Sequence, residues 1–101
     1  MTHRIERAAR ARDDLVEVWL YLAAHDPSAA DRQLRRLDSA IASLADFPRL
    51  GRARDDMRPG IRSLLCAPHL VLYDVSDDLA LVRVIRVIDA RRDLPSIEIE
   101  P

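Results

Sequence analysis

The stretch that decides the fold is residues 79–88, LALVRVIRVI, in which apolar and β-branched residues follow one another almost without interruption. Such a run is typical of a strand that is covered on much of both faces. Arg83 and Arg86 interrupt the run, and because their parity along a strand differs, they are predicted to point to opposite faces. We therefore expect residues 79–88 to form the central strand of a sheet.

Two strands are predicted directly before this one, at residues 61–66 and 70–75. Both segments alternate with period two. The turn signals Pro68-His69 and Asp77-Asp78 separate the three strands. Close sequence spacing of this kind favours antiparallel neighbours, so the three strands are predicted to form a mostly antiparallel sheet.

Residues 48–60, PRLGRARDDMRPG, precede these strands and contain two prolines and both glycines of the chain. They are predicted to form a loop, held at its start by Phe47 and Leu50.

Two helices are predicted before the loop, at residues 9–25 and 27–46. Asp26 suits the N-cap of the second helix and Pro27 suits its first turn, so the helices are predicted to fold back as a hairpin. The apolar stripes are Ala11, Leu15, Val18, Trp19 and Leu22 in the first helix, and Ala30, Leu34, Leu37, Ile41 and Leu44 in the second. Trp19, Tyr21 and Tyr73 are predicted to belong to the core.

A short strand is predicted at residues 2–7, and the tail that ends in IEIEP is either an added edge strand or loose. The predicted order is β-α-α-β-β-β, in one domain that covers residues 1–101. This order indicates the α+β class, with a helical hairpin packed on a small, mostly antiparallel sheet.

The composition excludes several classes of protein. Sixteen basic residues against seventeen acidic ones give a net charge of −1, which excludes binding of nucleic acid by bulk positive charge. Every basic residue is arginine, so no mechanism that needs a lysine amine is available. The single cysteine, Cys66, is expected to be a buried thiol in a cytoplasmic protein. The histidines at 3, 25 and 69 lack metal-ligand spacing, so no metal and no cofactor is expected.

Four short motifs stand in order along the chain. They are ARDDLVEVWLYL at 11–22, FPRLGR at 47–52, PGIRSL at 59–64 with LVLYDV at 70–75, and VRVIRVIDARRDL at 82–94. Together they resemble the motifs of ParE-type toxins of the RelE/ParE toxin–antitoxin superfamily, over residues 3–94. The chain departs from the family pattern at Pro68, His69 and Asp89-Ala90.

The resemblance implies the toxin of a type II toxin–antitoxin system, which inhibits DNA gyrase by binding and is neutralised by a ParD-like antitoxin. One alternative is a RelE-like, ribosome-dependent mRNA endonuclease, and another is a degenerate toxin that only binds antitoxin. An endonuclease needs a base, an acid and cations. This chain has no lysine, Leu70 where RelE-like toxins place an arginine, and no tyrosine or histidine after Tyr73. The missing groups favour the non-catalytic toxin.

Arginine suits bidentate binding of carboxylates and phosphates, and the loop and C-terminal arginines are expected to converge at one edge of the sheet. The candidates for target binding are Arg58, Arg62, Arg83, Arg91 and Arg92. Arg62 and Arg92 match family arginines, and each could instead pair with Asp74 or Asp93 to hold the end of the sheet. The candidates for antitoxin binding are Val16, Leu20, Ala23, Arg52 and Arg54.

Overall fold

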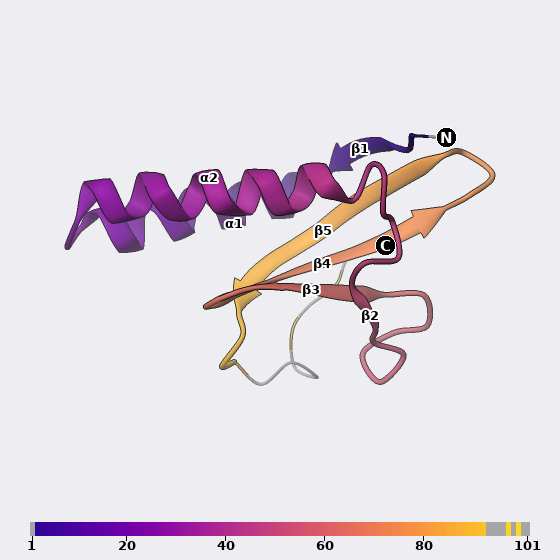
Figure 1. Cartoon of the computed structure of the whole chain (residues 1–101). Helices are drawn as coiled ribbons and strands as arrows, with labels where there is room; N and C mark the ends of the chain where they lie inside the picture. The colour runs from indigo at the N-terminus through magenta and orange to yellow at the C-terminus, as the bar shows by residue number, and fades with distance from the viewer. Residues whose placement is uncertain (1, 93–96, 98, 100–101) are drawn as a thin grey trace.

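The computed structural model describes residues 2–92, 97 and 99 and shows two helices packed on one five-stranded sheet (Figure 1). The elements are β1 (Arg4–Arg7), α1 (Ala9–Ala23), α2 (Pro27–Ser43), β2 (Arg52–Ala53), β3 (Arg62–Cys66), β4 (His69–Ser76) and β5 (Leu81–Asp89). The strand order is β1-β5-β4-β3-β2. Among these five strands, β1 pairs in parallel with β5, and the other neighbours are antiparallel. The predicted α+β class and helical hairpin are confirmed.

The strand β5 lies between β1 and β4, as predicted for the central strand. It contains a bulge, because Leu72 pairs with Arg86 whereas Tyr73 pairs with Val84, so that Ile85 is an extra residue. The bulge resets the alternation of β5. As a result Val84 and Val87, which differ in parity, pack in the same core cluster.

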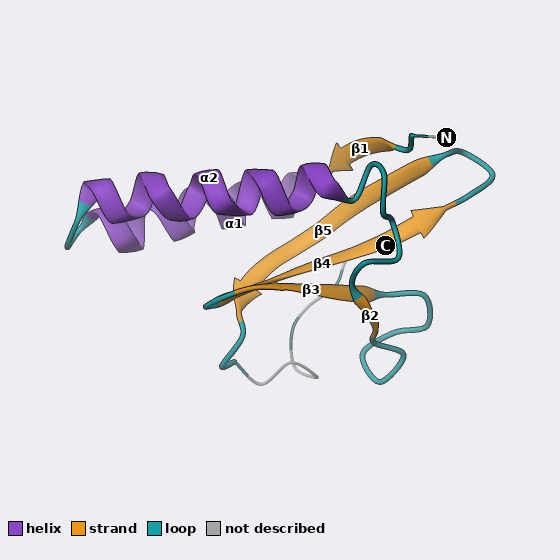
Figure 2. Ribbon diagram, viewed as in Figure 1, coloured by secondary structure: helices purple, strands orange, loops and turns teal. Residues whose placement is uncertain are grey.

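The helices α1 and α2 cover one face of the sheet (Figure 2). Asp26 caps α2 as predicted, because its Oδ1 accepts hydrogen bonds from the backbone N–H groups of Ser28 at 3.1 Å and Ala29 at 3.2 Å. The helices end at Ala23 and Ser43, earlier than predicted. The core between helices and sheet contains Ala11, Leu15, Leu37, Ile41, Cys66, Val71, Val84 and Val87.

The opposite face of the sheet carries a second apolar cluster, which neither α1 nor α2 covers. It consists of Ile61, Leu70, Leu72, Ile85 and Ile88, and Ile97 packs against it. The two alternatives for the tail, an added edge strand or a loose end, concern residues that lie largely outside the described part of the chain.

Two predictions about the strands are wrong in detail. Arg52–Ala53 form the short strand β2 inside the segment predicted to be a loop, and this pairing depends on β3 rather than on any local pattern. His69 is the first residue of β4 rather than part of a turn, and the Ala67-Pro68 bond before it is cis.

The prediction that three aromatic residues lie in the core is correct only for Tyr73, which is fully buried. Trp19 is 38% exposed and its Nε1 donates to Asp31 at 2.9 Å, while Tyr21 is 72% exposed. The reason is geometric, since only one face of α1 meets both α2 and the sheet, and the wide apolar stripe extends beyond that face.

Candidate functional site

The outer face of α1 exposes apolar side chains to solvent. Val16 is 58% exposed and Leu20 is 57% exposed, while Ala23, on the same face, is half-buried. Residues at this spacing are neighbours on one side of a helix. The structure therefore leaves uncovered the two larger apolar residues that were predicted to bind antitoxin, and they do not pack under α2.

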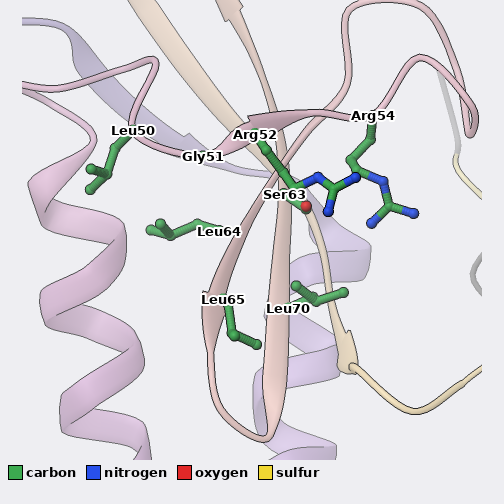
Figure 3. A pocket seen from close by; sticks show the side chains of 8 residues that line it. All are labelled: Leu50, Gly51, Arg52, Arg54, Ser63, Leu64, Leu65 and Leu70. Atoms are coloured by element: carbon green, nitrogen blue, oxygen red, sulfur yellow. The ribbon is translucent and has the colours of Figure 1, made fainter.

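A second candidate surface is a pocket of about 440 Å³ at the edge of the sheet (Figure 3). The strand β2 pairs only with Arg62 and Ser63, so within the described residues Leu64–Cys66 have no partner strand on that side. The pocket is lined by Leu50, Gly51, Arg52, Arg54, Ser63, Leu64, Leu65 and Leu70. Arg52 and Arg54, two of the residues predicted to bind antitoxin, thus lie together at an open sheet edge.

These two arginines differ in how firmly they are held. Arg54 donates through Nε and Nη2 to the two carboxylate oxygens of Asp56, each at 3.0 Å. This bidentate pair raises the pKa of Arg54 and lowers the pKa of Asp56. Arg52 is exposed on the same edge, so it is the more available of the two for a partner's carboxylate.

Arg62 holds the loop that leads into β2. Its Nη1 donates to the carbonyl oxygen of Gly51 at 2.7 Å, whereas Asp74, one of the two carboxylates named as alternative partners, accepts from Arg83, and Asp93 lies outside the described residues. The N–H of Gly51 donates to the hydroxyl of Tyr73 at 2.8 Å, and burial raises the pKa of that hydroxyl. A Cβ atom at Gly51 would lie 2.6 Å from the carbonyl oxygen of Ser63, so the chain can pass here only as glycine.

The remaining predicted arginines belong to separate places on the molecule. Arg83 pairs with Asp74 at 3.4 Å, within the sheet, and Nη1 of Arg58 donates to the carbonyl oxygen of Ile99 at 3.5 Å. Arg91 donates to both carboxylate oxygens of Asp89, at 2.9 and 2.6 Å, and lowers the pKa of that carboxyl.

The predicted convergence of the arginines at one edge is therefore wrong. Arg62 lies opposite Tyr73 on β4, whereas the end of β5, which Arg91 and Arg92 follow, lies opposite His69. Tyr73 and His69 are four positions apart along β4, which separates the two groups by roughly 13 Å at the rise of a strand. The positions of these arginines along the chain could not predict this separation, because it depends on the pairing registers of β3, β4 and β5.

A buried ion pair, which the sequence analysis missed, joins α1 to β5. Asp14 and Arg86 are each 5% exposed at their side chains, and Nε of Arg86 lies 2.7 Å from Oδ2 of Asp14. The same oxygen accepts from the backbone N–H of Val87 at 2.9 Å. The available signal was the helical spacing of Asp14 from Ala11 and Val18, which places an acidic residue on the buried stripe.

Two further observations concern the described residues only. They contain no group of three or more histidine, cysteine, aspartate or glutamate side chains that could hold a metal ion. None of their helices is both long enough and apolar enough to span a membrane.

Comparison with known proteins places the chain in a family. Residues 5–94 match the family model of the ParE toxin of the type II toxin–antitoxin system parDE. Toxin ParE1 of Mycobacterium tuberculosis is 34% identical over 95 residues, which cover 93% of this chain and 96% of that protein. Toxin ParE3 of Caulobacter vibrioides is 40% identical over 65 residues, which cover 64% of this chain and 63% of that protein.

Solved structures share the fold at low sequence identity. A chain from the chromosomal ParDE toxin–antitoxin system of P. aeruginosa superimposes with a TM-score of 0.72 at 19% identity, covering 87% of this chain and 96% of that one. A mutant of the E. coli toxin RelE in the free state superimposes with a TM-score of 0.65 at 19% identity, covering 90% of this chain and 86% of that one. At this level of identity, these likenesses show a shared fold.

Proposed function

We propose, since this chain belongs to the ParE toxin family of type II toxin–antitoxin systems, that it inhibits DNA gyrase by binding and that a ParD-like antitoxin neutralises it. The observation that carries this proposal is the match of residues 5–94 to the ParE toxin model. Both proposed partners act in the cytoplasm, which is therefore the proposed location.

Binding without catalysis is supported by the state of the groups that acid–base chemistry would need. The hydroxyl of Tyr73 is buried and accepts from the N–H of Gly51. Leu70 is buried in the sheet, at the position where RelE-like toxins place an arginine. With no lysine in the chain, the permanent cations that could hold a phosphate are arginine guanidinium groups, and these bind phosphates and carboxylates but do not exchange protons near neutral pH.

Target binding is proposed for the exposed arginines first. Arg92 is exposed after the end of β5, and Arg91 beside it is held by Asp89. Arg58 and Arg83 are also proposed, because each is held by a single long hydrogen bond that a target could replace. Arg62 acts through the loop, because its bond to Gly51 positions the chain that leads into β2.

Expression of the toxin without antitoxin, with a reporter of DNA damage, tests the proposed mode of action. A gyrase poison is expected to stop growth and to induce the reporter, because cleaved DNA accumulates. Growth arrest with cleaved mRNA and a silent reporter would favour the RelE-like alternative and contradict the gyrase proposal.

Antitoxin binding is proposed for the outer face of α1 and for Arg52 and Arg54 at the sheet edge. An apolar helix face that the chain does not cover suits an amphipathic partner segment. Leu20→Asp places a charge on this face, and since Leu20 is exposed the variant is expected to fold. Ala42→Asp, on the exposed face of α2, is the matched control.

Binding of each variant to the co-encoded antitoxin is measured by titration calorimetry, with circular dichroism as the check of folding. We expect Leu20→Asp to lose affinity by about tenfold or more, and Ala42→Asp to bind like the unchanged toxin. Equal affinity of the two variants would show that the antitoxin does not use this face of α1.

A degenerate toxin is the second candidate, because the departures from the family pattern meet in one place. His69 pairs with Asp89 in the sheet, and the N–H of Ala90 donates to the carbonyl oxygen of Pro68 at 2.9 Å. If expression without antitoxin leaves growth unchanged while the antitoxin still binds, the degenerate toxin is the correct interpretation.

A further inference from the structure

A second pocket, of about 250 Å³, opens between α1 and the paired ends of β4 and β5. It lies on the helix side of the sheet, away from the open edge of β3. The pocket is lined by Asp14, Glu17, Val18, Tyr21, His69, Val87, Ile88, Asp89 and Arg92. Of these lining residues, Arg92 is also a candidate for target binding, and the proposed function makes no use of the others.

The ring of His69 is held in a defined orientation in the wall of this pocket. Nη1 of Arg36 donates to Oε1 of Gln33 at 2.7 Å, which turns the amide nitrogen of Gln33 toward His69. That nitrogen lies 3.0 Å from Nδ1 of His69, so Nδ1 accepts and the proton is assigned to Nε2. Burial lowers the pKa of His69, which keeps the ring neutral.

Most charges around the pocket are already compensated by a partner. Arg86 neutralises Asp14, and Arg91 neutralises Asp89. Among the hydrogen bonds and ion pairs of the described residues, none involves the carboxylate of Glu17 or the guanidinium group of Arg92. The pocket therefore offers a carboxylate acceptor from Glu17, together with N–H donors from Arg92 and from Nε2 of His69.

This combination selects against a simple anion. A phosphate group in the pocket would face the carboxylates of Asp14, Glu17 and Asp89. The pocket instead suits a neutral, planar ligand that carries donors on one edge and an acceptor nearby. Val18 and Ile88 provide apolar walls, and the phenol ring of Tyr21, which is 72% exposed, provides a surface for stacking.

We propose that this pocket binds an unpaired guanine base of single-stranded nucleic acid. Guanine has adjacent N–H donors at N1 and N2, which match the two oxygens of the Glu17 carboxylate, and acceptors at O6 and N7, which match Arg92 and His69. Stacking on an aromatic side chain and hydrogen bonding along an exposed base edge is the usual way in which proteins hold unpaired bases. The site shares Arg92 with the proposed target-binding residues, but its test requires neither gyrase nor antitoxin.

Titration of the free, full-length chain with nucleosides, followed by NMR of the His69 ring and the backbone amides, tests the proposal. Guanosine is expected to bind saturably and to shift the His69 resonances. Inosine lacks the 2-amino group, and adenosine presents the opposite donor pattern, so both are expected to bind about tenfold more weakly or worse. Guanosine, deoxyguanosine and short single-stranded oligonucleotides of each type then distinguish RNA from DNA as the source of the base.

Glu17→Gln keeps the size of the side chain but replaces one acceptor with a donor, so guanosine affinity is expected to fall about tenfold or more. Glu6→Gln, on the exposed side of β1, is the matched control and is expected to bind guanosine normally. Tyr21→Ala, at an exposed position, is expected to weaken the binding of every base through loss of stacking.

Four results would each overturn the proposal. The first is the absence of any His69 shift at millimolar guanosine. The second is equal affinity for guanosine, adenosine and cytidine, and the third is unchanged affinity in Glu17→Gln. A response to inorganic phosphate equal to the response to guanosine monophosphate would likewise contradict recognition of the base.

Discussion

Removal of the buried charge at Asp14 is expected to cost a large part of the stability of the fold. Asp14 accepts from Nε of Arg86 at 2.7 Å, from Nη2 of Arg86 at 3.2 Å and from the N–H of Val87 at 2.9 Å. Both side chains of the pair are 5% exposed. Asp14→Asn keeps the shape of the side chain but leaves the guanidinium charge of Arg86 buried without this carboxylate.

Loss of one partner from a buried ion pair costs about 3–5 kcal/mol, out of a total of roughly 5–15 kcal/mol for a domain. For a chain of 101 residues this corresponds to a fall in melting temperature of about 15–25 °C. Asp13→Asn is the control, because Asp13 is exposed one residue away and the substitution removes the same charge from the same part of α1.

Thermal and urea unfolding followed by circular dichroism measure both variants against the unchanged chain. Asp13→Asn is expected to lie within about 0.5 kcal/mol of the unchanged chain. If Asp14→Asn is no less stable than Asp13→Asn, the pair does not join α1 to β5 in the way described. A double variant, Asp14→Leu with Arg86→Met, is expected to recover part of the loss, because both charges of the buried pair are then removed.

Three further predictions concern the loop before β2 and the wall of the second pocket. Tyr73→Phe leaves the N–H of Gly51 without its acceptor and is expected to cost about 1–3 kcal/mol in urea unfolding; no change would mean that water replaces the hydroxyl. Gly51→Ala brings a Cβ to 2.6 Å from the carbonyl oxygen of Ser63 and is expected to destabilise more than Tyr73→Phe, by the same measurement. Because burial lowers the pKa of His69 below 6.5, the unfolded chain binds more protons below that pH, so stability is expected to fall as pH drops from about 7 to 5. His69→Gln is expected to flatten the dependence of stability on pH between about 7 and 5. If the slope is unchanged in this variant, His69 is not the group that causes the loss of stability.

Periodicity was sufficient for most of the fold. The near-continuous apolar run at residues 79–88 predicted the central strand, and the stepwise apolar residues with Asp26-Pro27 predicted the helical hairpin. Both signals are local, since they depend on which side chains repeat along a single element. The elements that were missed or misplaced, β2 and the start of β4 at His69, depend on pairing with another strand.

The candidate site was only partly predictable, because its side chains form hydrogen bonds and ion pairs with residues that are distant in sequence. Exposure of Val16 and Leu20 followed from an apolar stripe too wide for one interface. The hydrogen bond from Arg62 to Gly51 is accepted by a backbone carbonyl. Every residue has such a carbonyl, so the order of residue types does not indicate which one accepts. The pairing of Asp14 with Arg86 crosses 72 positions of the chain, which no spacing rule covers.

The central claim, inhibition of gyrase by binding, is tested most directly with purified gyrase and the chain freed of antitoxin. We expect loss of DNA supercoiling together with accumulation of cleaved DNA, at a stoichiometry near that of the enzyme. Arg92→Ala is expected to weaken the effect without loss of stability, because Arg92 is exposed. Full supercoiling at an excess of folded toxin would contradict inhibition of gyrase by this chain.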